Sequence, residues 1–219
     1  INRPDALNAL NGAVLSGLEL AIDSLAADAE VRVVILTGTG KAFVAGADIG
    51  QMRDLDPNGA RAFAAMGHRV LDKLSGMRAI VIAAVNGFAL GGGCGLSLAG
   101  DLAYARAKAR FGQPEVNLGL MPGFGGTQRL ARRVGAMRAL ELTTTARMVK
   151  ADEAKAIGLC LDVCAPEELL EKVQGIAAGI AVSVALARVQ AFVSITQEGN
   201  QLEAGIAINL AMRGLNIED

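Results

Sequence analysis

The feature that most constrains the fold is an alternation of short β-branched runs with longer stretches of helical periodicity. Residues 31–37 (VRVVILT) and 79–85 (AIVIAAV) are apolar almost throughout, which is typical of strands in a parallel sheet covered on both faces. Apolar residues recur every three or four positions from Ala6 to about Ala27, which predicts an amphipathic helix. Asp56 predicts the N-cap of a second helix over residues 57–74, with proline in its first turn. The sequence therefore predicts an α/β fold.

The pattern changes at about residue 165. Before that point we expect further short strands at Leu102 to Ala105 and around Phe111, whereas the rest of the chain is helical almost throughout. We therefore divide the chain into a core over residues 1–165 and a helical region over residues 166–219. We expect both ends to be trimmed, because the chain starts with Ile rather than Met and stops without an obvious closing element.

Composition excludes several classes of function. The 219 residues carry 21 Lys and Arg against 22 Asp and Glu, so the chain lacks the basic face of a sequence-independent nucleic-acid binder. Six Phe, one Tyr and no Trp leave few stacking platforms for single strands. No apolar run approaches the roughly 20 residues of a membrane span, and no signal peptide is visible. We expect a cytoplasmic protein.

The three cysteines and the single histidine predict neither a disulfide framework nor a zinc site. Cys160 and Cys164 fit best as apolar residues along a strand. Cys94 stands at the start of a helical piece, where a thiolate would be stabilised, but a nucleophile needs a base and His68 lies on another predicted helix. We therefore expect Cys94 to pack and His68 to face solvent or cap a helix. No metal is predicted.

Two glycine-rich turns, at 91–95 and 123–126, lead into helical segments. Such turns bring backbone N–H groups close to a ligand at the positive end of a helix, which suits an anion. Both nucleotide fingerprints fail, because no Gly-Lys pair is followed by Ser or Thr and neither turn has the G-x-G-x-x-G spacing. The remaining ligand-binding interpretation is an oxyanion hole, in which two N–H groups face an oxygen that gains charge. The alternative is that the glycines serve only tight turns and close packing.

A second loop of small residues, 38–48, follows the first predicted strand and contains Ala45-Gly46-Ala47. None of these side chains is large enough to block a ligand. Asp48, at the end of this loop, is interpreted as the N-cap of a short helix from Ile49 to Arg53, with a nucleotide contact as the alternative. Asp101, before a predicted strand, is expected to make a structural hydrogen bond.

Four motifs, in order, resemble the crotonase superfamily, and in particular enoyl-CoA hydratase. The similarity covers nearly the whole chain, and the segment Asn2 to Leu10 looks like the usual opening of that family. The motifs are Lys41-Ala42-Phe43-Val44-Ala45-Gly46-Ala47-Asp48-Ile49, Asn86-Gly87-Phe88-Ala89-Leu90-Gly91-Gly92-Gly93-Cys94, Phe111-Gly112-Gln113-Pro114-Glu115 and Pro122-Gly123-Phe124-Gly125-Gly126-Thr127-Gln128-Arg129-Leu130.

This resemblance implies a crotonase-like ββα spiral core with an α-helical C-terminal region that mediates homotrimers, often paired into dimers of trimers. It also implies an acyl-coenzyme A thioester as substrate, without a metal or redox cofactor. The N–H groups of Ala45 and Gly92 would form the oxyanion hole for the thioester carbonyl. Polarising that carbonyl makes an α-proton removable or a conjugated double bond open to water, and Glu115 would transfer the proton.

The resemblance further implies which residues line the ligand. The loop of Ala45, Ala47, Asp48 and Ile49 would contact the adenine and pantetheine of coenzyme A. Gly123 would lie near the acyl group and the catalytic water. A basic patch on one predicted helix has two open interpretations, a contact with the coenzyme A phosphates or a solvated or subunit-facing surface; its members are Arg129, Arg132 and Arg133.

One position departs from the family pattern. Hydratases of this family use a second glutamate directly after Gly-Gly-Gly-Cys, where this chain has Gly95. Glycine offers neither a proton nor an oxygen that orients water. Three alternatives follow: a hydratase of 2-enoyl thioesters with one retained glutamate, a double-bond isomerase that uses Glu115 alone, or a member that binds acyl-coenzyme A with weak or no turnover.

Overall fold

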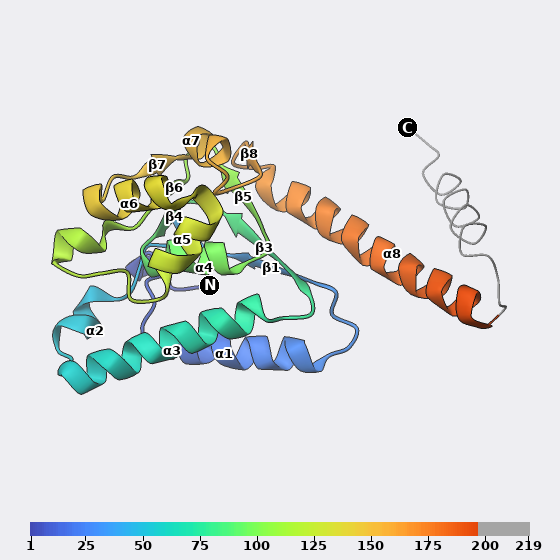
Figure 1. Ribbon diagram of the computed structural model, residues 1–219, viewed down its shortest axis with the longest axis horizontal. Coiled ribbons are helices and arrows are strands. Elements are labelled where there is room, and N and C mark those ends of the chain that lie inside the picture. The colour runs from blue at the N-terminus through green and yellow to red at the C-terminus, as the bar shows by residue number, and fades with distance from the viewer. Residues whose placement is uncertain (197–219) are drawn as a thin grey trace. The chain divides into compact units, whose positions relative to one another are not determined.

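The computed structural model describes residues 1–196, with side chains through residue 183 (Figure 1). Residues 1–175 form one compact unit, and the residues from 176 onward are grouped separately. The helix α8 (Leu169–Thr196) begins in the first unit. The predicted helical region therefore starts inside that unit, and its residues 197–219 lie outside the described residues.

Four parallel strands form the first sheet, in the order β1-β3-β5-β8. They are β1 (Val33–Thr37), β3 (Ile80–Val85), β5 (Leu102–Arg106) and β8 (Asp162–Cys164). The two predicted β-branched runs pair directly, with Val34 opposite Val81. β3 is buried along almost its whole length, as predicted, whereas β1 is only half-buried. The prediction that both runs are covered on both faces therefore holds for the central strand alone.

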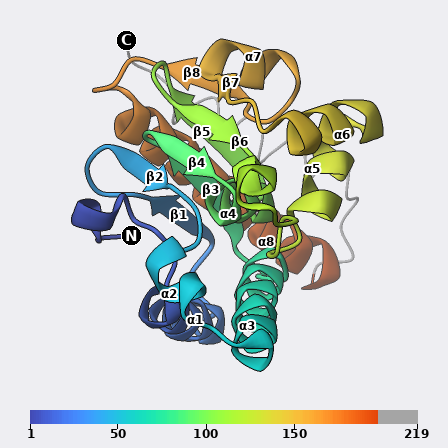
Figure 2. The same cartoon turned by 90° about the vertical axis from the view of Figure 1, so that its left-hand side faces the viewer.

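A second four-stranded sheet, in the order β2-β4-β6-β7, was only partly predicted. Its strands are β2 (Ala42–Val44), β4 (Phe88–Leu90), β6 (Arg110–Gly112) and β7 (Val149–Lys150). Strands of two or three residues carry too little periodicity to be recognised, and only β6 was expected. Each of β2, β4 and β6 follows a strand of the first sheet and precedes helical structure, and the three run parallel (Figure 2). This repetition agrees with the predicted ββα spiral.

Helices complete the repeats. They are the 3-10 turns η1 (Pro4–Ala6) and η2 (Pro114–Leu118), and the α-helices α1 (Gly12–Ala27), α2 (Ile49–Arg53), α3 (Pro57–Ser75), α4 (Gly92–Ala99), α5 (Gly126–Val134), α6 (Ala136–Thr145) and α7 (Ala151–Ala156). The predicted cap of α3 is confirmed, since Asp56 Oδ1 accepts from the Gly59 N–H at 2.6 Å. α1 and α3 lie side by side and are joined by an ion pair of 2.8 Å between Glu19 and Arg69 (Figures 1 and 2).

The first helix begins at Gly12 rather than at the predicted Ala6. Leu7 and Asn8 have φ angles of 50° and 60°, which a right-handed helix excludes. The Asn8 side chain is fully buried; its Nδ2 donates to the carbonyls of Thr39 at 2.9 Å and Ala42 at 2.8 Å. The apolar residues before Gly12 are therefore held by contacts distant in sequence, which periodicity does not register.

The predicted structural residues behave largely as expected. Asp101 Oδ2 accepts from the Val81 N–H at 2.8 Å, which confirms its structural role. The three cysteines are free and buried, and Cys164 lies in β8 while Cys160 precedes that strand. Burial raises the pKa of Cys94 to about 12, so this thiol stays protonated and is a poor nucleophile. Among the helices of residues 1–196, none is sufficiently long and apolar to cross a membrane.

The ring of Phe124 occupies a slot between α3 and α4. It packs edge-on against Phe63, with ring centroids 5.4 Å apart. A Cβ atom at Gly67 would lie 2.3 Å from Cδ1 of this ring, and one at Gly92 would lie 2.8 Å from Cδ2. Both distances are well below van der Waals contact, so glycine is required at both positions for the ring to lie where it does.

We predict that Gly67→Ala lowers the free energy of unfolding while Gly17→Ala raises it. Both glycines lie inside helices, where alanine is favoured by up to about 1 kcal/mol. At Gly17 nothing lies within 4 Å of the added Cβ, whereas at Gly67 the Phe124 ring must move, at a cost of about 1–3 kcal/mol. Urea unfolding of the two variants measures both effects. Equal stabilisation by both substitutions would show that the Phe124 ring moves aside for a Cβ atom at position 67 without a cost in free energy.

Candidate active site

A cavity of about 510 Å³ lies within the first unit. Its lining residues come from the two loops of small residues, from α2, α3 and η2, and from the turn before α5: Ala45, Gly46, Ala47, Ile49, Met52, Arg53, Leu55, Ala60, Phe63, Ala64, Gly91, Gly92, Pro114, Glu115, Leu118, Leu120, Met121, Gly123 and Phe124. Exposure distinguishes two ends. Ile49 and Met121 are 58% and 78% exposed, whereas Phe63 and Phe124 are 9% and 6% exposed. The cavity therefore has an open outer end and a buried, aromatic inner end.

The loop after β2 is held by the N-terminal segment. The Leu10 N–H donates to the Gly46 carbonyl at 2.8 Å, and the Leu10 carbonyl accepts from the Asp48 N–H at 2.8 Å. Leu10 is fully buried, so these bonds are shielded from water. Gly46 has a φ of 116°, a conformation that only glycine adopts readily. Its backbone thus turns to present its carbonyl to Leu10.

This bonding aims the amide of Ala47. No peptide bond in the described structure is cis, and in a trans peptide the carbonyl and the following N–H point in opposite directions. Because the Gly46 carbonyl points at Leu10, the Ala47 N–H points away from Leu10, and Ala47 itself lines the cavity. The Ala45 N–H, by contrast, donates to the Leu7 carbonyl at 3.1 Å. This corrects the prediction for Ala45, which lines the cavity but has its amide engaged elsewhere.

The second predicted amide, that of Gly92, stands at the start of α4. The helix begins within the glycine cluster rather than after it, and Gly91 precedes it with a φ of 52° and a ψ of −120°. The Gly91 carbonyl accepts from the Gly95 N–H at 2.9 Å, so the Gly92 N–H points out of the helix start. The partial positive charge of a helix N-terminus adds to this amide. Ala47 and Gly92 therefore bring two N–H groups to one cavity.

Glu115 lies beside the start of α4. A Cβ atom at Gly91 would be 3.0 Å from its Oε1, so the carboxyl lies against the backbone that precedes Gly92. Burial raises the pKa of Glu115. Gln113 is 1% exposed, and with its amide nitrogen turned toward the carboxyl this nitrogen lies 3.0 and 3.2 Å from the two oxygens. Sequence reasoning missed Gln113 as an orienting partner, although it stands in the Gln-Pro-Glu motif. Among the described residues, Glu115 is the only acidic one that lines the cavity.

Gly95, the position that departs from the family pattern, is buried in α4 and does not line the cavity. A Cβ atom built there would lie 3.3 Å from Leu71 Cδ2 and 3.6 Å from the Phe124 carbonyl oxygen. A larger side chain at this position would have to displace packed groups. The described helix α4 therefore presents backbone, and no acid, to the inner end of the cavity.

The other predicted contact residues divide into two groups. Ile49 and Gly123 line the cavity, and their contacts with a bound thioester stay predictions. Asp48 does not: its Oδ1 accepts from the Gln51 N–H at 3.2 Å, which confirms the cap of α2, and its Oδ2 lies 2.5 Å from Arg3 Nη1. The hydrogen bond from Arg3 lowers the pKa of Asp48. This carboxylate therefore fastens the loop to the N-terminal segment.

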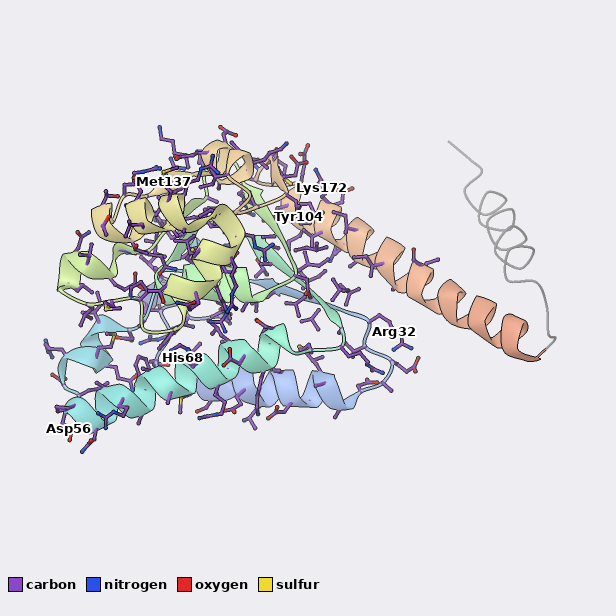
Figure 3. All side chains as sticks on the ribbon, in the orientation of Figure 1. Arg32, Asp56, His68, Tyr104, Met137 and Lys172 are labelled. Carbon is purple, nitrogen blue, oxygen red and sulfur yellow. The ribbon has the colours of Figure 1, made fainter. Side chains whose placement is uncertain are left out.

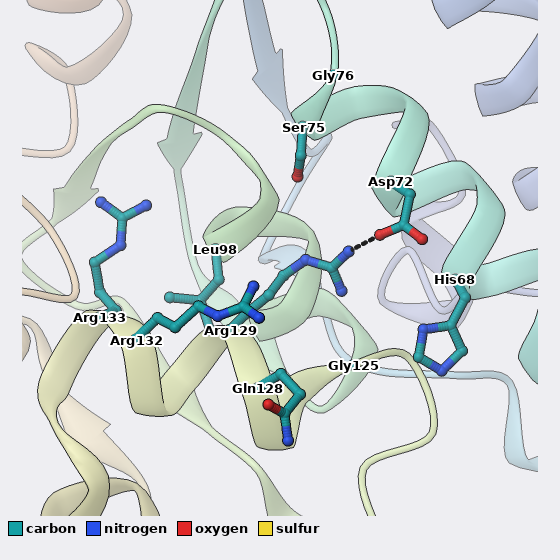
Figure 4. A pocket seen from close by; sticks show the side chains of 10 residues that line it. All are labelled: His68, Asp72, Ser75, Gly76, Leu98, Gly125, Gln128, Arg129, Arg132 and Arg133. Carbon is teal, nitrogen blue, oxygen red and sulfur yellow. Dashed lines mark hydrogen bonds and ion pairs between the residues drawn. The ribbon is translucent and has the colours of Figure 1, made fainter.

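The basic patch lies at a different place. Together with His68 and Asp72, the three arginines line a separate cavity of about 690 Å³ between α3 and α5 (Figure 4). His68 is exposed on α3, as predicted (Figure 3). None of these residues lines the cavity of Glu115. Within residues 1–183, no group of three or more His, Cys, Asp or Glu side chains is arranged to hold a metal ion.

Comparison with known proteins points to one family. A family model described as enoyl-CoA hydratase/isomerase matches residues 1–217. The chain is 51% identical over 178 residues to a short-chain-enoyl-CoA hydratase of Clostridium acetobutylicum, covering 81% of this chain and 68% of the relative. It is 47% identical to a crotonyl-CoA hydratase of Syntrophomonas wolfei, covering 96% and 81%. A crystal structure of an enoyl-CoA hydratase from Bacillus anthracis is 37% identical and superposes with a TM-score of 0.80, covering 95% and 82%.

We predict that Glu115→Gln raises stability near neutral pH and removes a pH dependence. Because burial raises the folded-state pKa of Glu115, the folded chain binds more protons than the unfolded chain between the ordinary carboxyl pKa of 4.5 and the raised value. The free energy of unfolding contributed by this group must then fall as the pH rises through that window and stay level above it. Urea unfolding of wild type and variant from acid to neutral pH measures the difference. A constant difference across the whole range would contradict the assignment.

Proposed function

Because this chain belongs to the enoyl-CoA hydratase/isomerase family and is an enzyme of the enoyl-CoA hydratase type, we propose that the cavity beside Glu115 adds water to the double bond of a short 2-enoyl-coenzyme A thioester. The observation that carries this proposal is that Ala47, Gly92 and the half-buried carboxyl of Glu115 line a single cavity. The names of two relatives, a short-chain-enoyl-CoA and a crotonyl-CoA hydratase, support the substrate class.

In the first step, the N–H groups of Ala47 and Gly92 donate hydrogen bonds to the thioester carbonyl oxygen. Their hydrogen bonds strengthen as negative charge moves onto that oxygen, so they favour the transition state over the bound substrate. The electron-poor double bond then becomes open to attack at the carbon farther from the carbonyl. No metal or redox cofactor is needed for this polarisation, and we propose that none is used.

In the second step, Glu115 transfers one proton from water to the substrate. Its carboxylate takes a proton from a water molecule whose oxygen bonds to the distal alkene carbon, and the electron pair of the double bond moves toward the oxyanion. The protonated carboxyl then returns a proton to the carbon next to the carbonyl. One carboxyl thereby serves as base and then as acid, and the sum of the steps is the addition of water. A pKa raised by burial suits both halves of this cycle.

The remainder of coenzyme A would leave through the open end. Ile49 and Arg53 of α2 line that end. The Arg53 side chain is 78% exposed and lies 3.0 Å from Asp54 Oδ1, so a phosphate that emerges there would compete with Asp54 for this cation. Asp48, which we predicted at this contact, contributes by holding the loop through Arg3.

A double-bond isomerase remains the second candidate, because one carboxyl is enough to move a proton between two carbons of a 3-enoyl thioester. The observation that favours it is Gly95, where the family pattern places a second acid. Conversion of a 3-enoyl thioester without hydration of crotonyl-CoA would decide for this candidate.

We also propose that the chain functions in the cytoplasm as a homotrimer or a dimer of trimers. Support for self-association comes from apolar side chains on α6: Met137 (Figure 3) is 84% exposed and Leu140 is 66% exposed. Such side chains are suited to burial against another copy. The cytoplasmic location rests on composition alone.

We predict that Glu115→Gln lowers kcat for hydration of crotonyl-CoA by about 10²–10⁴-fold, because the amide neither accepts nor returns a proton. Loss of enoyl absorbance measures the rate. Glu167→Gln, which neutralises an exposed carboxyl outside the cavity, serves as the matched control and retains activity. Equal rates for wild type and Glu115→Gln would remove Glu115 from the mechanism.

We predict that replacing the Ala47 amide by an ester lowers kcat by about 10²–10³-fold, the usual effect of losing one oxyanion donor. Incorporation of the α-hydroxy acid analogue of alanine removes the N–H and leaves the side chain unchanged. The same replacement at Ala45 removes only the bond to Leu7 and is expected to have a much smaller effect on kcat. A larger loss at position 45 than at position 47 would restore Ala45 as the donor.

A further inference from the structure

The structure assigns to Phe124 the role of limiting the acyl chain that the cavity accepts, and to Arg129, paired with Asp72, the role of holding Phe124 in place. This inference rests on the proposed function, since it concerns which thioester the same cavity binds. It adds a specificity-determining residue and a positioning residue, neither of which touches the proton transfer.

The location of Phe124 follows from the two ends of the cavity. A thioester carbonyl bound by the Gly92 amide places the acyl chain at the buried end, beside the ring that lies against Gly92. At 6% exposure, Phe124 closes this end together with Phe63. A long chain therefore meets an aromatic wall rather than solvent.

The wall cannot yield in the direction of the helices. A Cβ atom at Gly67 would already overlap the ring at 2.3 Å, so the ring lies directly on the backbone of α3. The neighbouring ring of Phe63 contacts it at a centroid distance of 5.4 Å. In a close-packed interior, a ring so placed moves only if these neighbours move with it.

The turn that carries Phe124 is held from its opposite side, in the cavity of the basic patch (Figure 4). Arg129 Nη1 donates to the Phe124 carbonyl at 2.9 Å, and Arg129 Nη2 lies 2.5 Å from Asp72 Oδ1. The Arg129 side chain is only 13% exposed, so the pair is partly shielded from solvent. One planar guanidinium thus joins α3, through Asp72, to the backbone of the turn. A lysine ammonium group would reproduce this pair of contacts poorly.

Arg132 provides a natural contrast. It stands on α5 and lines the same cavity as Arg129, but within the described residues it makes no hydrogen bond to the turn. A variant at Arg132 removes the same charge from the same surface and leaves the Phe124 carbonyl bonded.

The first test compares kcat/KM for crotonyl-, 2-hexenoyl-, 2-octenoyl- and 2-decenoyl-coenzyme A in wild type, Phe124→Leu and Phe124→Ala. One methylene in an apolar pocket changes kcat/KM by about 10–200-fold. We expect the ratio of octenoyl to crotonyl activity to rise at least tenfold in Phe124→Ala, and by less in Phe124→Leu. A ratio of two substrates measured on one preparation does not depend on how much of the variant is folded. Phe124→Leu keeps the test usable if Phe124→Ala fails to fold.

The second test applies the same substrates to Arg129→Gln and to Asp72→Asn, with Arg132→Gln as the matched control. Releasing the turn is expected to shift the ratio toward longer chains, by less than Phe124→Ala does. A merely structural role of these residues would lower kcat/KM equally for all substrates and leave the ratio unchanged. Arg132→Gln is expected to keep the wild-type ratio.

Each outcome separates this inference from the proposed function. Hydration of crotonyl-CoA by wild type with an unchanged ratio in both Phe124 variants would overturn the role of Phe124 and leave the proposed function intact. If wild type hydrates none of the substrates, the proposed function fails, and the ratio of the calorimetric dissociation constants of butyryl- and octanoyl-coenzyme A replaces the kinetic ratio. A shift of that ratio toward octanoyl-coenzyme A in Phe124→Ala supports the role of Phe124, and an unchanged ratio overturns it. A shift in Arg132→Gln as large as in Arg129→Gln would overturn the role of Arg129.

Discussion

The site depends on three backbone hydrogen bonds between the N-terminal segment and the loop after β2. They satisfy the amides of Leu10, Ala45 and Asp48 and the carbonyl of Gly46, and by doing so they leave the Ala47 amide directed to the other side of the loop. The buried Asn8 ties the same segment to the start of β2. A loop of small residues has little packing of its own, so the fixed direction of one N–H group comes from a segment more than thirty residues away in sequence.

The residues at the inner end of the cavity explain why the pKa of the Glu115 carboxyl is raised. Around Glu115 the cavity is closed by backbone and by aromatic rings, because Gly95 leaves room for Leu71 and for the turn of Phe124. Desolvation raises the pKa of Glu115, and a hydrogen bond from its own backbone amide offsets part of that rise.

The sequence predicted those parts of the fold that local chemistry determines. The runs that became β1 and β3, the caps Asp48 and Asp56, and Glu115 after its proline were all visible as patterns. The strands β2 and β4 were too short to show a period. The choice of Ala47 over Ala45 was beyond local reasoning, because both are small residues in one loop and only the distant acceptor at Leu7 distinguishes their amides. The family resemblance supplied the loop but not the direction of its peptides.

The turn at residues 122–126 links the two cavities physically. Its inward side presents the ring of Phe124 beside Gly92, and its outward side presents the carbonyl of the same residue to Arg129. Asp72 stands on α3, the helix that also supplies the slot for the ring. Both sides of the turn are therefore positioned by α3, directly through the ring and indirectly through Arg129. The guanidinium of Arg129 holds both the Asp72 carboxylate and the Phe124 carbonyl with one planar fork.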